Sequence, residues 1–302
     1  MIVCVAPNPS IDKLFEVERV EQGAIHRPTA FVQVPGGKGL NVARAAATLG
    51  ADVCAVALLG GHHGRWIADE FERVGMPLTA VWYEGETRSC LSVADAAIGS
   101  LTEFYEDGAP VDADAWNDFV ARVAELGTTA SWVTVSGSLP PGVPRDGYVG
   151  LVGAGNVALD SRMLGDARPR LVKVNEEEAA QQTGARDPLA AARALREHAG
   201  GSGAAAVVTQ GRVGAVLVDP DGDEWRGTLA AAGAYPVGSG DAFLAGLVVA
   251  LERGASWPDA LSTALGAGAA NAELPGAGRL EPARAQALAE RATVTSAGPT
   301  LE

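Results

Sequence analysis

The sequence predicts an α/β protein built on a mainly parallel sheet, and two observations lead to this fold class. Short apolar runs rich in valine alternate with alanine-rich segments of helical spacing, which is the order that βαβ units produce. Several of these runs are apolar at every position, as expected for strands covered on both faces. Ligands of such sheets bind near the carboxyl ends of the strands, so polar residues that follow a strand are the first candidates for a site.

The expected elements follow one another in order along the chain. We expect buried strands at Ile2–Ala6, Asp52–Leu59, Ser131–Ser136, Val157–Asp160, Leu171–Val174, Ala206–Thr209 and Ala215–Val218. Helical spacing predicts helices at Leu40–Leu49, Arg65–Val74, Ala113–Leu126, Leu189–His198, Ala242–Arg253, Trp257–Ala270 and Pro282–Ala292. The chain after Val218 is therefore expected to be mostly helical.

Two stretches break the alternation and predict a second, smaller sheet. Leu14–Val34 has strand-like spacing of mixed polarity without a helix, and Cys90–Ala94 with Leu101–Tyr105 has the pattern of a hairpin. Since no repeat or linker divides the chain, we expect one domain, residues 1–302, from which a small sheet of about residues 12–34 and 88–106 projects.

Residues 142–173 carry a poor helical pattern. Ser161–Arg170 is barely long enough for a crossover between parallel strands, which normally takes a dozen residues or more. We expect either very short helices or irregular structure in this part of the chain.

Composition excludes several classes of partner. The 23 basic and 37 acidic residues give a formal charge of −14, which disfavours binding to nucleic acid or to an anionic membrane surface. No run of 18 apolar residues predicts a membrane span, and the N-terminal segment lacks the basic start of a signal peptide. The three cysteines are widely spaced in apolar runs, so we expect buried free thiols in a reducing compartment, the cytoplasm.

The strongest motif is Pro236–Phe243, where small residues lead directly into a predicted helix. Gly238 and Gly240 let the backbone expose consecutive N–H groups at the positive end of the helix dipole, which is a natural anion site. Asp241 stands where a carboxylate could take a proton from a hydroxyl group beside that anion. The alternative is that Asp241 only caps the helix.

A second glycine-rich segment, Pro35–Ala43, opens another predicted helix. It holds Lys38, one of only three lysines, one turn from Asn41, and so predicts a polar ligand close to the backbone. It lacks the spacing of a Walker A loop, and no complete dinucleotide-binding fingerprint is present. The alternative is a plain turn before a helix.

Two further segments follow predicted strands, and one histidine pair does not qualify as a site. Leu171–Glu178 ends in three glutamates, which are usually a solvated first helical turn. The loop Ser136–Gly142 has hydroxyl and N–H groups that could hold a phosphate. The neighbouring residues His62 and His63 cannot easily face one metal ion, so we interpret them as loop surface.

Together these motifs resemble the PfkB (ribokinase-like) family of ATP-dependent carbohydrate kinases. The resemblance spans nearly the whole chain and rests on Asn8–Asp12, Gly36–Ala43, Gly85–Arg88, Ser136–Gly142, Lys173–Glu178, Thr209–Gly211 and Val237–Phe243. It implies a three-layer α/β/α fold with a mainly parallel central sheet and a small β-sheet lid, which often forms a homodimer interface. The combination of motifs is most similar to the sugar-phosphate branch, with its 1-phosphofructokinase, tagatose-6-phosphate kinase and minor 6-phosphofructokinase members.

The resemblance also implies roles for individual residues. Asp241 would be the general base, and the N–H groups of Gly238, Ser239 and Gly240 would stabilise charge on the transferring phosphoryl group. Sugar hydroxyls would be held by Asp12, Gly36, Gly37, Lys38 and Asn41, and the substrate phosphate by Arg27, Arg88 and Ser138. ATP would lie near Lys173, Asn175, Thr209, Gly211, Gly214, Gly238, Gly240 and Asn271, with Glu178 orienting Mg²⁺ through water.

Three functions remain open, and the first is the main hypothesis. It is transfer of the ATP γ-phosphoryl group to a hydroxymethyl group of a phosphorylated ketohexose, fructose 1-phosphate before tagatose 6-phosphate or fructose 6-phosphate. The second is a kinase of an unphosphorylated sugar or nucleoside, and the third is a non-catalytic sugar or nucleotide sensor. The chain departs from the family pattern at Val174, where proline is commoner, and in the short stretch between Gly142 and Lys173.

Overall fold

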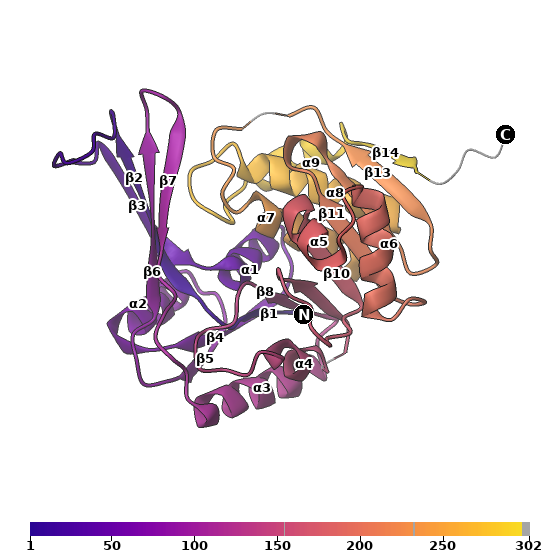
Figure 1. Ribbon diagram of the computed structural model, residues 1–302, viewed down its shortest axis with the longest axis horizontal. Coiled ribbons are helices and arrows are strands. Elements are labelled where there is room, and N and C mark those ends of the chain that lie inside the picture. Colours follow the sequence, from indigo (N-terminus) through magenta and orange to yellow (C-terminus); the bar gives the residue numbers. More distant parts are fainter. Residues whose placement is uncertain (154, 232, 298–302) are drawn as a thin grey trace.

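The computed structural model describes residues 1–153, 155–231 and 233–297. A ten-stranded sheet runs through the molecule in the order β14-β13-β12-β11-β10-β9-β8-β1-β4-β5 (Figure 1). Its strands are β1 (Ile2–Ala6), β4 (Val53–Leu59), β5 (Leu78–Trp82), β8 (Trp132–Ser136), β9 (Val157–Asp160), β10 (Leu171–Asn175), β11 (Ala205–Thr209), β12 (Ala215–Val218), β13 (Glu224–Thr228) and β14 (Thr293–Ser296). Pairing is parallel from β11 to β5 and antiparallel from β11 to β14, so the predicted mainly parallel sheet is confirmed.

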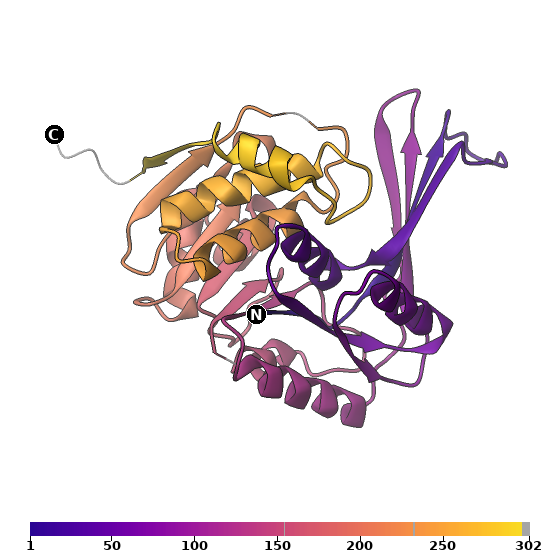
Figure 2. The same cartoon turned by 180° about the vertical axis from the view of Figure 1, so that it is seen from behind.

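Helices cover both faces of this sheet. One face packs against α1 (Lys38–Thr48), α2 (Gly61–Arg73), α7 (Ser239–Glu252), α8 (Trp257–Asn271) and α9 (Pro282–Ala289). The other face packs against α3 (Ala113–Gly127), α4 (Gly147–Val152), α5 (Glu176–Thr183) and α6 (Pro188–Ala199). In β1, Cys4 and Ala6 lie in the first core and Val3 and Val5 in the second, which is why the strand is apolar at every position. The arrangement is the expected three-layer α/β/α fold (Figures 1 and 2).

A smaller four-stranded sheet projects from one end of the molecule (Figure 1). Its order is β3-β2-β6-β7, with β2 (Ser10–Val17), β3 (Ala30–Gly36), β6 (Arg88–Asp95) and β7 (Ser100–Tyr105). The chain enters it from β1, and β3 pairs back along β2 so that Ser10 lies opposite Gly36. This pairing places the glycine-rich segment directly before α1, whose first turn packs against the carboxyl end of β1.

Three strands of the main sheet are absent from the sequence-based expectation. β5 was not predicted, and the expected helical region after Val218 is wrong at β13 and β14. β13 has the sequence Glu-Trp-Arg-Gly-Thr, whose charges and glycine favour no strand by themselves. It forms because the exposed edge of β12 offers backbone donors and acceptors, and β14 extends the same edge.

The stretch between Gly142 and Lys173 combines both expected alternatives. α4 spans only six residues, and the neighbouring parallel strands β9 and β10 are joined through residues 161–170 without a helix. Leu164 and Ala167 of this connection are buried in the second hydrophobic core. These two side chains cover the sheet where a crossover helix would otherwise pack.

Two smaller observations complete the fold. Within the described ranges, no helix is both long and apolar enough to cross a lipid bilayer. Cys4, Cys54 and Cys90 are buried free thiols, as the sequence predicts. Burial raises the pKa of Cys4 to about 12, which makes this thiol chemically inert at neutral pH.

Candidate active site

A cavity of about 580 Å³ opens where the carboxyl ends of the central strands, the start of α7 and the smaller sheet meet. Its size lies in the range of small-molecule sites. Most of the residues predicted from the sequence line it, although they come from segments far apart in the chain. They are Asp12, Gly37, Lys38, Asn41, Arg88, Ser138, Lys173, Asn175, Glu178, Thr209, Gly211, Gly214, Gly238, Ser239, Gly240 and Asp241.

The N-terminus of α7 faces this cavity without a side-chain cap. Gly238 is the N-cap residue and adopts the left-handed backbone conformation, with φ of 80°. A β-carbon at this position would lie 2.5 Å from the Cβ atom of Ala277, so glycine is required on two grounds. The Ser239 N–H group closes the preceding turn by donating to Pro236 O over 3.1 Å, whereas the N–H groups of Gly240 and Asp241 have no acceptor among the described residues and remain available to an anion.

Asp241 does not cap α7, which removes the alternative interpretation of this residue. It is the third residue of the helix, its side chain is buried, and its Oδ2 atom accepts a hydrogen bond of 2.9 Å from Asn41 Nδ2. Burial raises the pKa of Asp241 to about 6, assisted by the negative charge of Asp160 and opposed by Lys38, Lys173 and the Asn41 hydrogen bond. A carboxylate with this pKa is ionised at neutral pH and basic enough to accept a proton from a positioned hydroxyl group.

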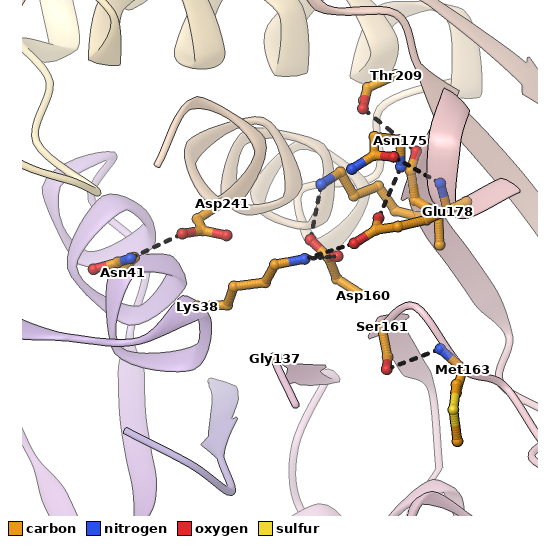
Figure 3. A network of polar contacts seen from close by, with 12 residues as sticks. Lys38, Asn41, Gly137, Asp160, Ser161, Met163, Asn175, Glu178, Thr209 and Asp241 are labelled. Atoms are coloured by element: carbon orange, nitrogen blue, oxygen red, sulfur yellow. Dashed lines mark hydrogen bonds and ion pairs between the residues drawn. The ribbon is translucent and has the colours of Figure 1, made fainter. Parts of the chain in front are cut away.

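Asp160 bridges two lysines beneath the cavity (Figure 3). Its Oδ1 atom lies 2.9 Å from Lys38 Nζ and its Oδ2 atom 2.8 Å from Lys173 Nζ. Although burial of this fully enclosed carboxyl opposes ionisation, the two ammonium groups outweigh that effect and lower the pKa of Asp160. Asp160 also raises the pKa of Lys38, so this lysine is cationic at neutral pH. Lys38 and Lys173 both line the cavity.

The segment Gly36–Gly39 is glycine-rich because three pieces of chain come together there. A β-carbon on Gly36 would overlap the Asp12 carboxylate, and one on Gly39 would overlap the backbone of β1. Gly37 has φ of 86°, and its N–H group donates to Asp12 Oδ2 over 3.4 Å. Burial raises the pKa of Asp12, whose other oxygen accepts a bond of 2.6 Å from Ser10 Oγ. The glycines thus let Asp12 pack against the backbone immediately before Lys38.

A second polar group surrounds Asn8, whose carbonyl oxygen lies close to Gly37. The Arg88 guanidinium donates to the carbonyl oxygen of Asn8 from Nη2 over 3.1 Å and to that of Glu106 from Nη1 over 3.1 Å. Asn8 Nδ2 in turn donates to Ser138 Oγ over 3.1 Å. Asn8 therefore brings Arg88 of the smaller sheet next to Ser138 of the loop after β8.

The third group of predicted residues follows β10 and β11. Asn175 and Glu178 form a capping box at the start of α5. The three glutamates therefore form the first turn of a helix, as the sequence predicts. Glu178 also lies 3.5 Å from Lys38 Nζ through its Oε1 atom. Thr209 is the register partner of Asn175 on the next strand and leads into the one-turn 3₁₀ helix Gly211–Val213. Gly211 and Gly214 line the cavity beside it.

Three predicted residues do not line the cavity. Gly36 packs against the side chain of Asp12, which itself lines the cavity. Asn271 is fully buried and supports the loop before α7, because its Nδ2 atom donates to Val237 O over 2.9 Å. Arg27 lies in the exposed connection between β2 and β3, away from the cavity.

The sequence interpretation missed Asp160 and misplaced the histidine pair. Asp160 is the last residue of a strand that was predicted correctly, and a charged residue at the carboxyl end of a buried parallel strand was an available signal. His62 and His63 belong to the first turn of α2, not to a loop. Glu86 accepts a hydrogen bond of 2.6 Å from the His63 backbone N–H group, and no cluster able to hold a metal occurs among the described residues.

The start of α7 has no side-chain cap, a buried carboxylate lies beside it, and two lysines line the same cavity above a parallel sheet. These features define an α/β enzyme that handles an anionic group. Residues 6–284 match the family described as "pfkB family carbohydrate kinase", and the chain belongs to this family.

Solved structures agree with the assignment. Phosphofructokinase-2 from Escherichia coli, in a tetrameric inhibited form, is 26% identical with a TM-score of 0.86, over 96% of this chain and 98% of that chain. A possible 1-phosphofructokinase from Thermotoga maritima is 22% identical with a TM-score of 0.84, over 99% and 100%. Arabidopsis thaliana ribokinase is 20% identical with a TM-score of 0.72, over 96% and 98%. The last two similarities concern the fold alone, which is ribokinase-like.

Proposed function

We propose that this sugar kinase transfers the γ-phosphoryl group of ATP to a hydroxymethyl group of a phosphorylated ketohexose. Fructose 1-phosphate is the first expected substrate, with tagatose 6-phosphate and fructose 6-phosphate as the others. The observation that carries the proposal is the Asp241 carboxylate, which is buried next to the uncapped start of α7 instead of capping it. Phosphoryl transfer needs mainly such positioning and charge stabilisation.

In the proposed mechanism, Asp241 accepts the proton of the acceptor hydroxyl group while the oxygen attacks the γ-phosphorus atom. The N–H groups at Gly238 and Gly240, which have no acceptor among the described residues, stabilise the charge on the transferring group, and the bond to ADP breaks. Lys38 and Lys173, held by Asp160, supply further positive charge, and Lys173 Nζ lies directly next to Gly240 at the start of α7. Asp12, Gly37, Lys38 and Asn41 would hold the sugar hydroxyl groups, with Gly36 shaping their backbone.

The phosphate already on the substrate is assigned to Arg88 and Ser138, which Asn8 holds together. Arginine suits this role because its planar donors match paired phosphate oxygens. The E. coli phosphofructokinase-2 has been solved in complex with fructose 6-phosphate, which supports a sugar phosphate as substrate here. Arg27 lies outside the cavity of its own chain, so it would reach a substrate only from a second copy.

ATP is assigned to the side of the cavity formed by Lys173, Asn175, Thr209, Gly211 and Gly214, with Asn271 supporting the phosphate-binding turn. The Glu178 carboxylate is partly exposed and lines the cavity. It offers the hard oxygen ligands that Mg²⁺ prefers. Mg²⁺ commonly keeps several waters and takes few protein carboxylates, which fits a single glutamate acting through water. The ion would neutralise charge on the ATP phosphates.

We further propose that the smaller sheet is a lid of a single-domain protein and the interface of a homodimer. Seven large apolar residues of this sheet and its connecting loops are exposed, namely Val20, Ile25, Phe31, Ile98, Leu101, Phe104 and Tyr105. Sedimentation of the protein and of a Phe104→Asp variant tests this: the variant should be monomeric. A wild-type monomer at micromolar concentration would contradict the dimer.

A coupled assay of ADP release tests the substrate. We expect turnover with fructose 1-phosphate, tagatose 6-phosphate or fructose 6-phosphate and little with free fructose, tagatose, ribose or a nucleoside. Arg88→Ala should reduce kcat/KM for the sugar phosphate by about 100-fold or more, as expected when a charged hydrogen-bonded contact is lost. Turnover of free sugars alone would overturn the sugar-phosphate proposal and leave the kinase assignment intact.

One observation favours the second candidate, a kinase of an unphosphorylated sugar or nucleoside. The Arg88 guanidinium already donates to two backbone carbonyl oxygens, and these contacts alone would explain an arginine at this position. In that case Arg88→Ala lowers protein stability and affects phosphorylated and free substrates equally. The ratio of the two kcat/KM changes therefore separates the candidates.

A further inference from the structure

The side-chain amide of Asn41 is held from both ends. Its Nδ2 atom donates to Asp241 Oδ2 over 2.9 Å, and its Oδ1 atom accepts from Arg44 Nη1 over 3.3 Å. Asn41 and Arg44 lie one turn apart on α1, whereas Asp241 belongs to α7. An amide can turn either its oxygen or its NH₂ group toward a neighbour, and only the NH₂ group attracts a carboxylate.

Arg44 determines which way this amide faces. A guanidinium group has donors and no acceptor, so the amide atom next to Arg44 must be the oxygen. The NH₂ group of Asn41 then necessarily points toward Asp241. With an uncharged or absent neighbour at position 44, the amide could rotate and present its oxygen to the carboxylate, which would be repulsive.

Arg44 is itself fixed by two further segments. Its guanidinium donates to the carbonyl oxygen of Ala277 from Nη1 over 2.6 Å and to that of Pro35 from Nη2. Burial lowers the pKa of Arg44 to about 10, partly offset by Asp12 and Asp241, so it stays charged at neutral pH. The side chain does not line the cavity, and it is therefore not a ligand-binding group.

We propose that Arg44 is a positioning residue for the reaction: by orienting the Asn41 amide, it holds the Asp241 carboxylate in the geometry in which it accepts the proton. This inference rests on the proposed function of Asp241 and adds a residue to it. The proposal follows from the chain of contacts Arg44–Asn41–Asp241, which joins the end of β3, the loop after α8, α1 and α7.

Other charges also act on Asp241 and must be kept constant in a test. The charged groups that face it or its Arg44 neighbour are Lys38 and Arg44 of α1, Asp160 of β9, Lys173 of β10, Asp12 of β2 and Arg279 of the loop after α8. Arg44→Lys keeps every charge and removes the planar fork of donors, so it isolates the orienting effect.

The matched control is Arg196→Lys. Arg196 of α6 likewise donates to two backbone carbonyl oxygens, those of Asp219 over 2.9 Å and Pro220 over 2.7 Å, and it lies outside the cavity. Both substitutions should cost a similar amount of stability in urea unfolding. Only Arg44→Lys should lower kcat, by between about 10- and 100-fold with KM little changed, because positioning of the reacting group is lost.

A double-mutant cycle decides whether Arg44 acts through Asn41. If it does, Arg44→Lys in an Asn41→Ala background lowers kcat by less than about twofold beyond Asn41→Ala alone. An equal loss in both backgrounds would overturn the proposal. Should Arg44→Lys fold poorly by circular dichroism, Arg44→Gln, which keeps amide donors but loses the charge, is used in the same cycle. Because the lost charge acts on Asp241 in both backgrounds, a smaller loss of kcat in the Asn41→Ala background supports the proposal and an equal loss overturns it.

A direct titration of Asp241 makes the test independent of turnover. Carbon-13 NMR of aspartate carboxyl groups, assigned with Asp241→Asn, should show an upward move of the Asp241 pKa by about one unit in Arg44→Lys, since a hydrogen bond to the charged form is lost. Arg196→Lys should leave it unchanged. A moved titration in a protein without kinase activity would refute the proposed function, and would leave only the finding that Arg44 orients Asn41 toward Asp241. Normal kinase activity with an unmoved titration would refute the inference alone.

Discussion

The ammonium group of Lys38 lies 2.9 Å from Asp160 Oδ1, although the two residues are 122 positions apart in the sequence. The second oxygen of the same carboxylate binds Lys173 at 2.8 Å, so two of the three lysines of the chain share one buried anion. A chain with a formal charge of −14 thereby builds a local cationic surface for anionic ligands. Both lysines are already oriented before a phosphate group arrives, and Lys173 is also buried.

Asp160→Asn should destabilise the protein strongly. The substitution leaves two ammonium groups, one of them buried, without their counter-charge, and loss of one partner of a buried pair costs on the order of 3 kcal/mol. Urea unfolding at pH 7.5 measures the change. Glu273→Gln is the control, because it breaks the partly exposed pair with Arg284, which solvent screens. Equal losses for the two variants would show that the Asp160 bridge is not special.

The acid side of the pH–rate profile should report Asp241. Because its pKa is raised to about 6 and only the ionised form accepts a proton, kcat/KM should rise with pH through about 6 and then level off. Asp160 is one of the causes of the raised pKa, so Asp160→Asn should shift this limb to lower pH. An unshifted limb would assign it to another group.

Asp241→Asn should abolish turnover and leave ATP binding nearly intact, because the amide keeps the shape of the site but cannot accept the proton. Calorimetric titration with a non-hydrolysable ATP analogue measures the binding. Full activity in this variant would remove Asp241 from the mechanism.

The effect of Asp241→Asn on the free energy of unfolding should depend on pH. Folding raises the pKa of Asp241 from 3.8 to about 6, so the folded state holds the proton more tightly, and stability from this group declines as pH rises between these values. Above pH 6, Asp241→Asn should therefore be more stable than the wild type, by up to about 3 kcal/mol. Below pH 4 the advantage should disappear. Unfolding in urea at pH 4 and pH 8 checks the sign.

The predicted and observed elements agree best where burial on both faces dictates the sequence. β1 and β12 have the expected bounds because each of their buried positions must be apolar. The segments around Lys38 and Asp241 stood out because glycines precede a helix there. β13 was missed because its formation depends on the edge of β12, which no local pattern reveals.

Long-range contacts explain what the sequence could not predict about the site. The bond between Asn41 and Asp241 spans 200 residues, and the Asp160 bridge depends on the side-by-side register of β9 and β10. The motifs indicated which residues carry chemistry, but only the packing of α1 against α7 shows that Asn41 binds Asp241 and that Asp241 is not a cap. Arg27 was predicted from its position in a motif, but it lies in an exposed loop outside the cavity. The spacing of a motif does not show whether a loop will be exposed.

Gly238→Ala compared with Gly254→Ala should separate backbone strain from damage to the site. Both glycines adopt the left-handed conformation, with φ of 80° and 81°, before and after α7 respectively. A β-carbon at Gly254 meets no atom within 4 Å, whereas one at Gly238 would lie 2.5 Å from Ala277 Cβ. Each substitution carries the backbone cost of about 1 kcal/mol.

Only Gly238→Ala should also displace the start of α7, because Ala277 must move or the helix must shift. We expect it to lower kcat/KM by about 100-fold, as misplacement of a phosphate-stabilising turn removes both positioning and charge stabilisation. Gly254→Ala should retain kcat/KM within about twofold, since it changes only the far end of the helix. Assays and urea unfolding of both variants give the comparison. Comparable activity in the two variants would mean that the N–H groups before Asp241 do not contact the transferring phosphoryl group.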